Sequence, residues 1–169
     1  MTLRFNVTEN DYLQFNIFHN KHSPTVRRTL LLLRFLLPVM LISFTFLSGR
    51  LSTINLISIA IISVIWFCVT PALFLCSIKR SVRRLMKEGK CNEFVGERTV
   101  IFSEASIRLE AETRTVETSF SAVERIVSDD ERFYIYIGAI SAYIIPFSAF
   151  ATKAEKAEFE AFINARQGQ

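Results

Sequence analysis

Two long apolar stretches dominate the first half of the chain. They cover residues 29–48 and 51–78, and a short polar step that includes Gly49 and Arg50 separates them. Arg34 is the only charged residue inside either stretch. A helix needs roughly 20 mostly apolar residues to cross a hydrocarbon core about 30 Å thick, so each stretch is long enough to span a membrane. The pattern therefore predicts a transmembrane helical hairpin over residues 29–78.

Residues 1–28 carry two shorter patterns. Thr2–Val7 alternates apolar and polar side chains, which predicts a half-buried strand. A helix is predicted next, because Thr8 and Asp11 have the spacing of a capping box and apolar residues then recur at helical spacing until Pro24. The segment is too short and too polar to span a membrane. It either lies on the membrane surface or packs against the C-terminal domain, and we favour packing because its strand needs a sheet to join.

After residue 95 the pattern changes to short alternating runs. These runs predict strands over residues 97–102, 106–111, 114–120, 124–127, 133–137 and 142–145. The polar Glu112 and Thr113 mark one of the turns between them. A last helix is predicted because Thr152 and Glu155 fit a second capping box. The chain is thus predicted to be an α+β membrane protein, in which residues 96–169 form a small antiparallel sheet or partial barrel closed by a C-terminal helix. Its core is predicted to include Phe120, Phe133, Ile135 and Phe162.

Basic residues predict the orientation of the hairpin. Lys21, Arg27 and Arg28 precede the first stretch, and a basic linker over residues 79–95 follows the second. Lysine and arginine near helix ends stay on the cytoplasmic side, so we predict a multi-pass protein of the inner membrane with cytoplasmic termini and Gly49 outside. The bases nearest the second stretch are also candidate contacts for lipid headgroups: Lys79, Arg80, Arg83, Arg84 and Lys87. We favour the simpler interpretation that they only set the topology.

The distribution of charge argues against nucleic-acid binding. Residues 79–90 hold six bases and one acid, whereas residues 91–169 hold eight bases and thirteen acids. The basic excess therefore lies beside the predicted membrane helix, and the C-terminal domain is acidic.

Arg34 is the exception inside the first apolar stretch. A charge within a membrane segment indicates a functional site by default. Arg34 follows Arg28 by six residues, which is about 9 Å of helix rise, so we expect its side chain to reach the cytoplasmic interface.

The sequence contains no recognisable catalytic, cofactor-binding or metal-binding motif. It has no nucleophile elbow, no glycine-rich phosphate loop and no HExxH. Cys68, Cys76 and Cys91 form no CxxC pair and predict no disulfide framework. His19 and His22 lie three residues apart, but a metal site normally needs three or four ligands. We therefore predict a protein that is not an enzyme and that holds no cofactor.

Three adjacent acidic residues lie between two predicted strands. Asp129, Asp130 and Glu131 could in principle bind a cation or shift one another's pKa. Acidic runs at such positions are much more often solvated turns, and that is the prediction here.

Four segments are similar to the YcxB-like bacterial membrane proteins. They are residues 9–16 (ENDYLQFN), 99–107 (TVIFSEASI), 120–126 (FSAVERI) and 145–150 (IPFSAF). The resemblance implies two membrane spans followed by a cytoplasmic domain with a pleckstrin-homology-like fold. It implies no particular catalytic or ligand-binding residues.

Three classes of function remain. We favour a non-enzymatic adaptor or regulator whose cytoplasmic domain binds a protein partner. The first alternative is a module in which the basic linker and the cytoplasmic domain together sense anionic lipid. The second is a small accessory subunit of a transport or signalling complex, with Asn55, Ser58 and Ser63 as its assembly surface. Membrane lipids are expected partners in each case, and self-association is left open.

Overall fold

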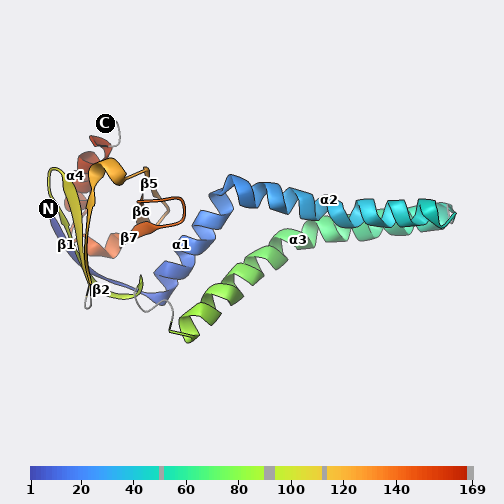
Figure 1. Cartoon of the computed structure of the whole chain (residues 1–169), viewed down its shortest axis with the longest axis horizontal. Coiled ribbons are helices and arrows are strands. Elements are labelled where there is room, and N and C mark those ends of the chain that lie inside the picture. The colour runs from blue at the N-terminus through green and yellow to red at the C-terminus, as the bar shows by residue number, and fades with distance from the viewer. Residues whose placement is uncertain (50–51, 90–93, 112–113, 167–169) are drawn as a thin grey trace. The chain divides into compact units, whose positions relative to one another are not determined.

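The computed structural model describes residues 1–49, 52–89, 94–111 and 114–166 and shows an α+β fold (Figure 1). The chain divides into a globular unit, Met1–Asn16 with Arg83–Gln169, and a hairpin unit, Ile17–Val82. The predicted features at Arg50, Lys90, Cys91, Glu112 and Thr113 lie outside the described residues.

The hairpin unit holds the end of the first helix, all of the second and most of the third. Helix α1 covers Glu9–His22, α2 covers Pro24–Leu47 and α3 covers Thr53–Lys87. Pro24 ends the N-terminal segment as predicted and also occupies the first turn of α2, where its missing N–H costs nothing. Helices α2 and α3 are each long and apolar enough to cross a membrane, and almost none of their apolar windows is buried. Residues 79–87 of the predicted linker are the last turns of α3.

The N-terminal strand joins a four-stranded antiparallel sheet. Its strands are β1 (Thr2–Val7), β2 (Gly96–Phe102), β3 (Ser106–Ala111) and β4 (Thr115–Ser119), in the order β1-β2-β3-β4. Leu3 lies opposite Val100, and both side chains point into the core. The prediction that the N-terminal segment packs on the C-terminal domain is therefore confirmed for its strand.

The remaining strands form a second, separate antiparallel sheet. Strands β5 (Arg125–Ser128), β6 (Arg132–Tyr136) and β7 (Ala142–Pro146) lie in the order β5-β6-β7, and α4 (Lys153–Asn164) follows. Among the described residues the two sheets do not close into one barrel, so the predicted single sheet or partial barrel becomes two sheets. Thr152 caps α4 as predicted, but the Glu155 carboxylate accepts from the N–H of Ala151 instead of that of Thr152.

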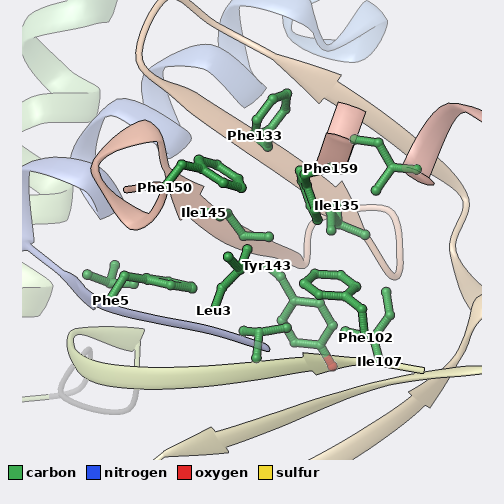
Figure 2. Close-up of a cluster of buried hydrophobic side chains, with 13 residues drawn as sticks. Leu3, Phe5, Phe102, Ile107, Phe133, Ile135, Tyr143, Ile145, Phe150 and Phe159 are labelled. Carbon is green, nitrogen blue, oxygen red and sulfur yellow. The ribbon is translucent and has the colours of Figure 1, made fainter. Parts of the chain in front are cut away.

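Both sheets and α4 share one hydrophobic core (Figure 2). Phe159 of α4 is fully buried, and its ring centroid lies 5.1 Å from that of Phe102 and 5.3 Å from that of Phe133. The predicted core residues Phe133 and Ile135 belong to this cluster, while Phe120 and Phe162 are partly buried against it. The core prediction is thus confirmed, with the last two residues at its margin.

Candidate functional site

Strand β6 is buried on both faces, whereas a strand at the surface of a small domain has one face in contact with solvent. Phe133 and Ile135 face the shared core. On the other face, the rings of Tyr134 and Tyr136 lie 5.6 Å and 5.9 Å from the ring of Phe15 in α1. The first half of α1 therefore covers the outer face of the second sheet.

An ion pair joins the same helix to β6. The Asp11 carboxylate accepts from Arg132 Nε at 2.7 Å, and the side chains of Arg132 and Asp11 are only 7% and 10% exposed. Asp11 also completes the predicted capping box, because it accepts from the N–H of Thr8 at 2.8 Å while its own N–H donates to Thr8 Oγ1 at 3.2 Å. One carboxylate thus starts α1 and anchors it to a strand that lies 121 residues away in the sequence.

The acidic turn before β6 completes this arrangement. Asp129 Oδ1 accepts from the backbone N–H groups of Glu131 and Arg132 at 2.8 Å and 2.7 Å, and Oδ2 accepts from the Tyr134 hydroxyl. Arg132 also forms ion pairs with both acidic residues. Its Nη2 lies 2.9 Å from Glu131 Oε2, and its Nη1 lies 3.7 Å from Asp129 Oδ2. The prediction of a solvated turn is therefore wrong for Asp129, which is an organised partner of a buried arginine. We call these residues the Arg132 cluster: Asp11, Asp129, Glu131, Arg132 and Tyr134.

The protonation of the Arg132 cluster follows from these bonds. Burial on its own would raise the pKa of Asp11, but the hydrogen bonds from Thr8 and Arg132 and the charge of Arg132 hold that pKa below its usual range. Burial, reinforced by the hydrogen bond to Asp129, raises the pKa of the Tyr134 phenol well above its usual range. The Asp11 carboxylate therefore stays charged and the Tyr134 phenol stays protonated near neutral pH. The cluster is therefore suited to holding α1 in place and not to proton transfer.

The predicted lipid contacts lie on one side of α3. Successive residues of a helix are about 100° apart, so these five bases span an arc of about 140°. All of them are exposed, whereas Val82, outside that arc, is buried. Arg84 forms an exposed pair with Glu88 at 3.0 Å. We call this side the basic face of α3: Lys79, Arg80, Arg83, Arg84 and Lys87.

A second group of polar contacts lies inside the hairpin unit. The Arg34 guanidinium of α2 stacks on the Phe67 ring of α3, with Cζ 4.6 Å from the centroid. Next to it, Trp66 Nε1 donates to the Leu33 carbonyl oxygen at 3.0 Å, which links the two helices. Ser58, one of the residues of the possible assembly surface, donates to the Ile54 carbonyl oxygen of its own helix at 2.9 Å.

The histidines and cysteines that the structure describes do not gather into a site. Nδ1 of His22 lies 2.9 Å from the Phe18 carbonyl oxygen within α1, and Cys68 and Cys76 are free and exposed on α3. Within the ranges that the structure describes, no group of three histidine, cysteine or acidic side chains could hold a metal ion.

Comparison with known families identifies part of the globular unit. Residues 102–163 match the family model for YcxB-like proteins. This segment is therefore similar to YcxB-like proteins, and we call it the YcxB-like segment. It runs from the end of β2 to α4, which confirms the resemblance seen at residues 120–126 and 145–150. No curated protein and no solved structure matches the chain.

The YcxB-like segment does not contain all of the Arg132 cluster. It supplies Asp129, Glu131, Arg132 and Tyr134, whereas Asp11 lies outside the matched residues. Strand β1 and helix α1 therefore complete the sheet and the ion cluster of the YcxB-like segment from the other end of the chain.

Proposed function

We propose that this chain is a non-enzymatic, multi-pass protein of the bacterial inner membrane whose globular unit binds a protein partner in the cytoplasm. The two apolar helices and the bases at their outer ends support this topology. A pleckstrin-homology-like fold is supported by the two antiparallel sheets followed by a C-terminal helix and by the YcxB-like match.

The open edge of β4 carries the proposal of partner binding. Ala111 and Arg114 exchange backbone hydrogen bonds, N to O, of 2.9 Å and 3.4 Å. Bonded and non-bonded pairs alternate along an antiparallel ladder, so Arg108 and Glu117, three steps along the register, are a non-bonded pair. The N–H and C=O of Glu117 therefore point away from β3. Among the described residues β4 pairs with no other strand, which leaves these groups at an open edge.

An extended segment of a partner fits this edge. An added strand satisfies the outward main-chain groups, and the alternate side chains then determine which partner binds. The exposed Glu117 side chain, paired with Arg108 at 3.1 Å, also discourages indiscriminate pairing with other edges. We therefore assign the edge to an extended polypeptide segment of a protein partner.

Proline substitution tests the assignment. A photo-crosslinking amino acid at the exposed Thr115 of the full-length protein in its membrane should form one discrete protein adduct. Glu117→Pro removes an outward N–H and should abolish the adduct, because an edge strand tolerates proline where its N–H faces solvent. Glu117→Ala removes the same side chain but keeps the N–H, so it should retain the adduct. Equal adducts in both variants, or no adduct at Thr115 in the unaltered protein, would refute partner binding at this edge.

The basic face of α3 supports a second candidate, recognition of anionic lipid. Its five side chains are all exposed, and a base near a charged membrane surface contributes about 1 kcal/mol of attraction. In nanodiscs with and without phosphatidylglycerol, hydrogen exchange of α3 residues 79–87 should slow only with the anionic lipid. Replacing the five bases by glutamine should remove that difference. An unchanged exchange rate would leave the basic face with the role of setting topology alone.

A further inference from the structure

The hairpin unit contains no counter-charge for Arg34. The sequence contains no aspartate or glutamate between Asp11 and Glu88, although the hairpin unit holds several bases. The Arg34 guanidinium stacks on Phe67, and its Nε is buried without a hydrogen-bond partner among the described residues. A cation in a membrane segment pairs with an anion or reaches the interface. Because the hairpin unit supplies no anion, an anionic partner of Arg34 would have to come from outside that unit.

The position of Arg34 along the helices fits a lipid headgroup. Arg34 is thirteen residues before the end of α2 at Leu47, and Phe67 is fourteen residues after the start of α3 at Thr53. At about 1.5 Å per residue, both lie roughly 20 Å from the turn, about two-thirds of the way across a 30 Å hydrocarbon core. The long arginine side chain and local thinning of the bilayer shorten the remaining path to the phosphate level.

Backbone groups add to the polarity of this level. Pro38 and Pro71 each lie four residues beyond the stacked pair, on α2 and α3. Proline has no N–H, so Pro38 cannot donate to the Arg34 carbonyl and Pro71 cannot donate to the Phe67 carbonyl. A lipid headgroup would complement this site. Its phosphate would bind the guanidinium, and its hydroxyl groups would donate to the two carbonyl oxygens.

An apolar groove begins beside this polar level. It has a volume of about 200 Å³ and is lined by Leu37, Ile62, Ile65, Trp66 and Val69. Leu37 on α2 and Ile62 on α3 lie closer to the turn than the stacked pair does, whereas Val69 lies two residues farther from it, so the groove runs mainly from the level of Arg34 toward the turn. A cation followed by an apolar groove in this direction matches a phosphate followed by an acyl chain.

We propose that the hairpin unit binds an anionic phospholipid, with the phosphate on Arg34 and one acyl chain in the groove beside Trp66. This inference rests on the proposal that the hairpin spans a membrane. It concerns a site separate from the basic face of α3, because Arg34 and the groove lie within α2 and the apolar part of α3.

The lipid site has a built-in probe, because Trp66 is the only tryptophan of the chain. The full-length protein is reconstituted in phosphatidylcholine vesicles that contain either dibrominated phosphatidylglycerol or dibrominated phosphatidylcholine. Bromine on the acyl chains quenches tryptophan fluorescence on contact. The brominated anionic lipid should quench Trp66 with a roughly tenfold higher apparent affinity, as expected for charge-assisted hydrogen bonds to one guanidinium. Equal quenching by the two lipids in the unaltered protein would overturn the proposal.

Matched variants separate Arg34 from general electrostatic attraction. Arg34→Gln should abolish the preference, whereas Arg28→Gln removes the same charge from the same helix and should preserve it. A preference that survives Arg34→Gln, or that is lost equally in both variants, would also overturn the proposal. A third outcome is that the protein shows no preference for the anionic lipid and that an acidic membrane protein co-purifies only when Arg34 is present. That result would reassign the site to a carboxylate of a protein partner.

Two further outcomes distinguish other failures. If neither brominated lipid quenches Trp66, the hairpin does not span the bilayer, and the proposed topology fails together with the lipid site. Inorganic phosphate, compared with sodium chloride at equal ionic strength, should leave the quenching unchanged. Selective relief of quenching by inorganic phosphate would show that a free anion occupies Arg34 and would contradict the lipid assignment.

Discussion

Replacing Asp11 by asparagine tests how the N-terminal helix is held. Asparagine keeps the size of the side chain and the oxygen that accepts from Thr8, but it removes the charge that faces Arg132. Because both ion-pair side chains are at least nine-tenths buried, the loss cannot be made up by water. We expect the first half of α1 to detach more readily from β6.

The magnitude follows from the remaining partners of Arg132. Breaking a fully buried ion pair by removing one member typically costs about 3–5 kcal/mol. Here Glu131 and Asp129 stay at 2.9 Å and 3.7 Å from the guanidinium and compensate part of its charge. We therefore expect a cost at or just below that range, about 2–3 kcal/mol, which corresponds to a factor of roughly 30 to 150 in an opening equilibrium.

Hydrogen exchange of the detergent-solubilised full-length protein measures this cost locally. Backbone amides in residues 9–16 should exchange roughly 30 to 150 times faster in Asp11→Asn under conditions where exchange reports the opening equilibrium. Glu131→Gln is the matched control, because Glu131 is 71% exposed and an exposed pair contributes at most about 1 kcal/mol. Equal effects of the two substitutions, or no effect of Asp11→Asn, would refute the argument that burial gives this ion pair its importance.

Two further predictions concern pH and the core. Because the pKa of Asp11 is lower in the folded protein, its contribution is complete above its unfolded value of about 3.9 and is lost as the pH falls through the folded pKa. The difference in exchange between the unaltered protein and Asp11→Asn should therefore shrink on acidification below pH 4, and a difference that grows would contradict it. Phe159→Ala should lower the free energy of unfolding of the globular unit by about 3–5 kcal/mol, because this ring is fully buried. Phe162→Ala should lower the free energy of unfolding clearly less, because this ring is only partly buried. Chemical denaturation followed by near-ultraviolet circular dichroism measures both costs, and a cost for Phe162→Ala equal to or larger than that for Phe159→Ala would contradict the prediction.

The strands and helices were largely predictable because each has a strong local pattern. The alternation in Thr2–Val7 and the apolar run in α2 identify their elements without reference to the rest of the chain. The division into two sheets was not predictable in this way, because sheet membership depends on pairing between distant segments. The pairing of β1 with β2 was expected only in general terms, from the need of an amphipathic strand for a partner.

The Arg132 cluster was missed because Asp11 lies far from its other members in the sequence. Asp11 was interpreted correctly as a capping residue, but nothing local indicates that its carboxylate also meets Arg132. A usable signal was the presence of Arg132 at the start of a strand in which all the remaining residues are apolar or aromatic. Such a strand is buried on both faces, so its one charged residue requires a counter-charge from a covering element.

The central claim, a membrane hairpin that presents the globular unit to the cytoplasm, is tested most directly by cysteine labelling in intact cells. Gly49 has a φ of 64°, a conformation that favours glycine, so the neighbouring exposed Ser48 is the better position at the turn. With the native cysteines replaced, an impermeant maleimide should label Ser48→Cys and should label Glu104→Cys, in the exposed β2–β3 turn, only after the cells are broken. Protection of Ser48→Cys together with labelling of Glu104→Cys in intact cells would contradict the account.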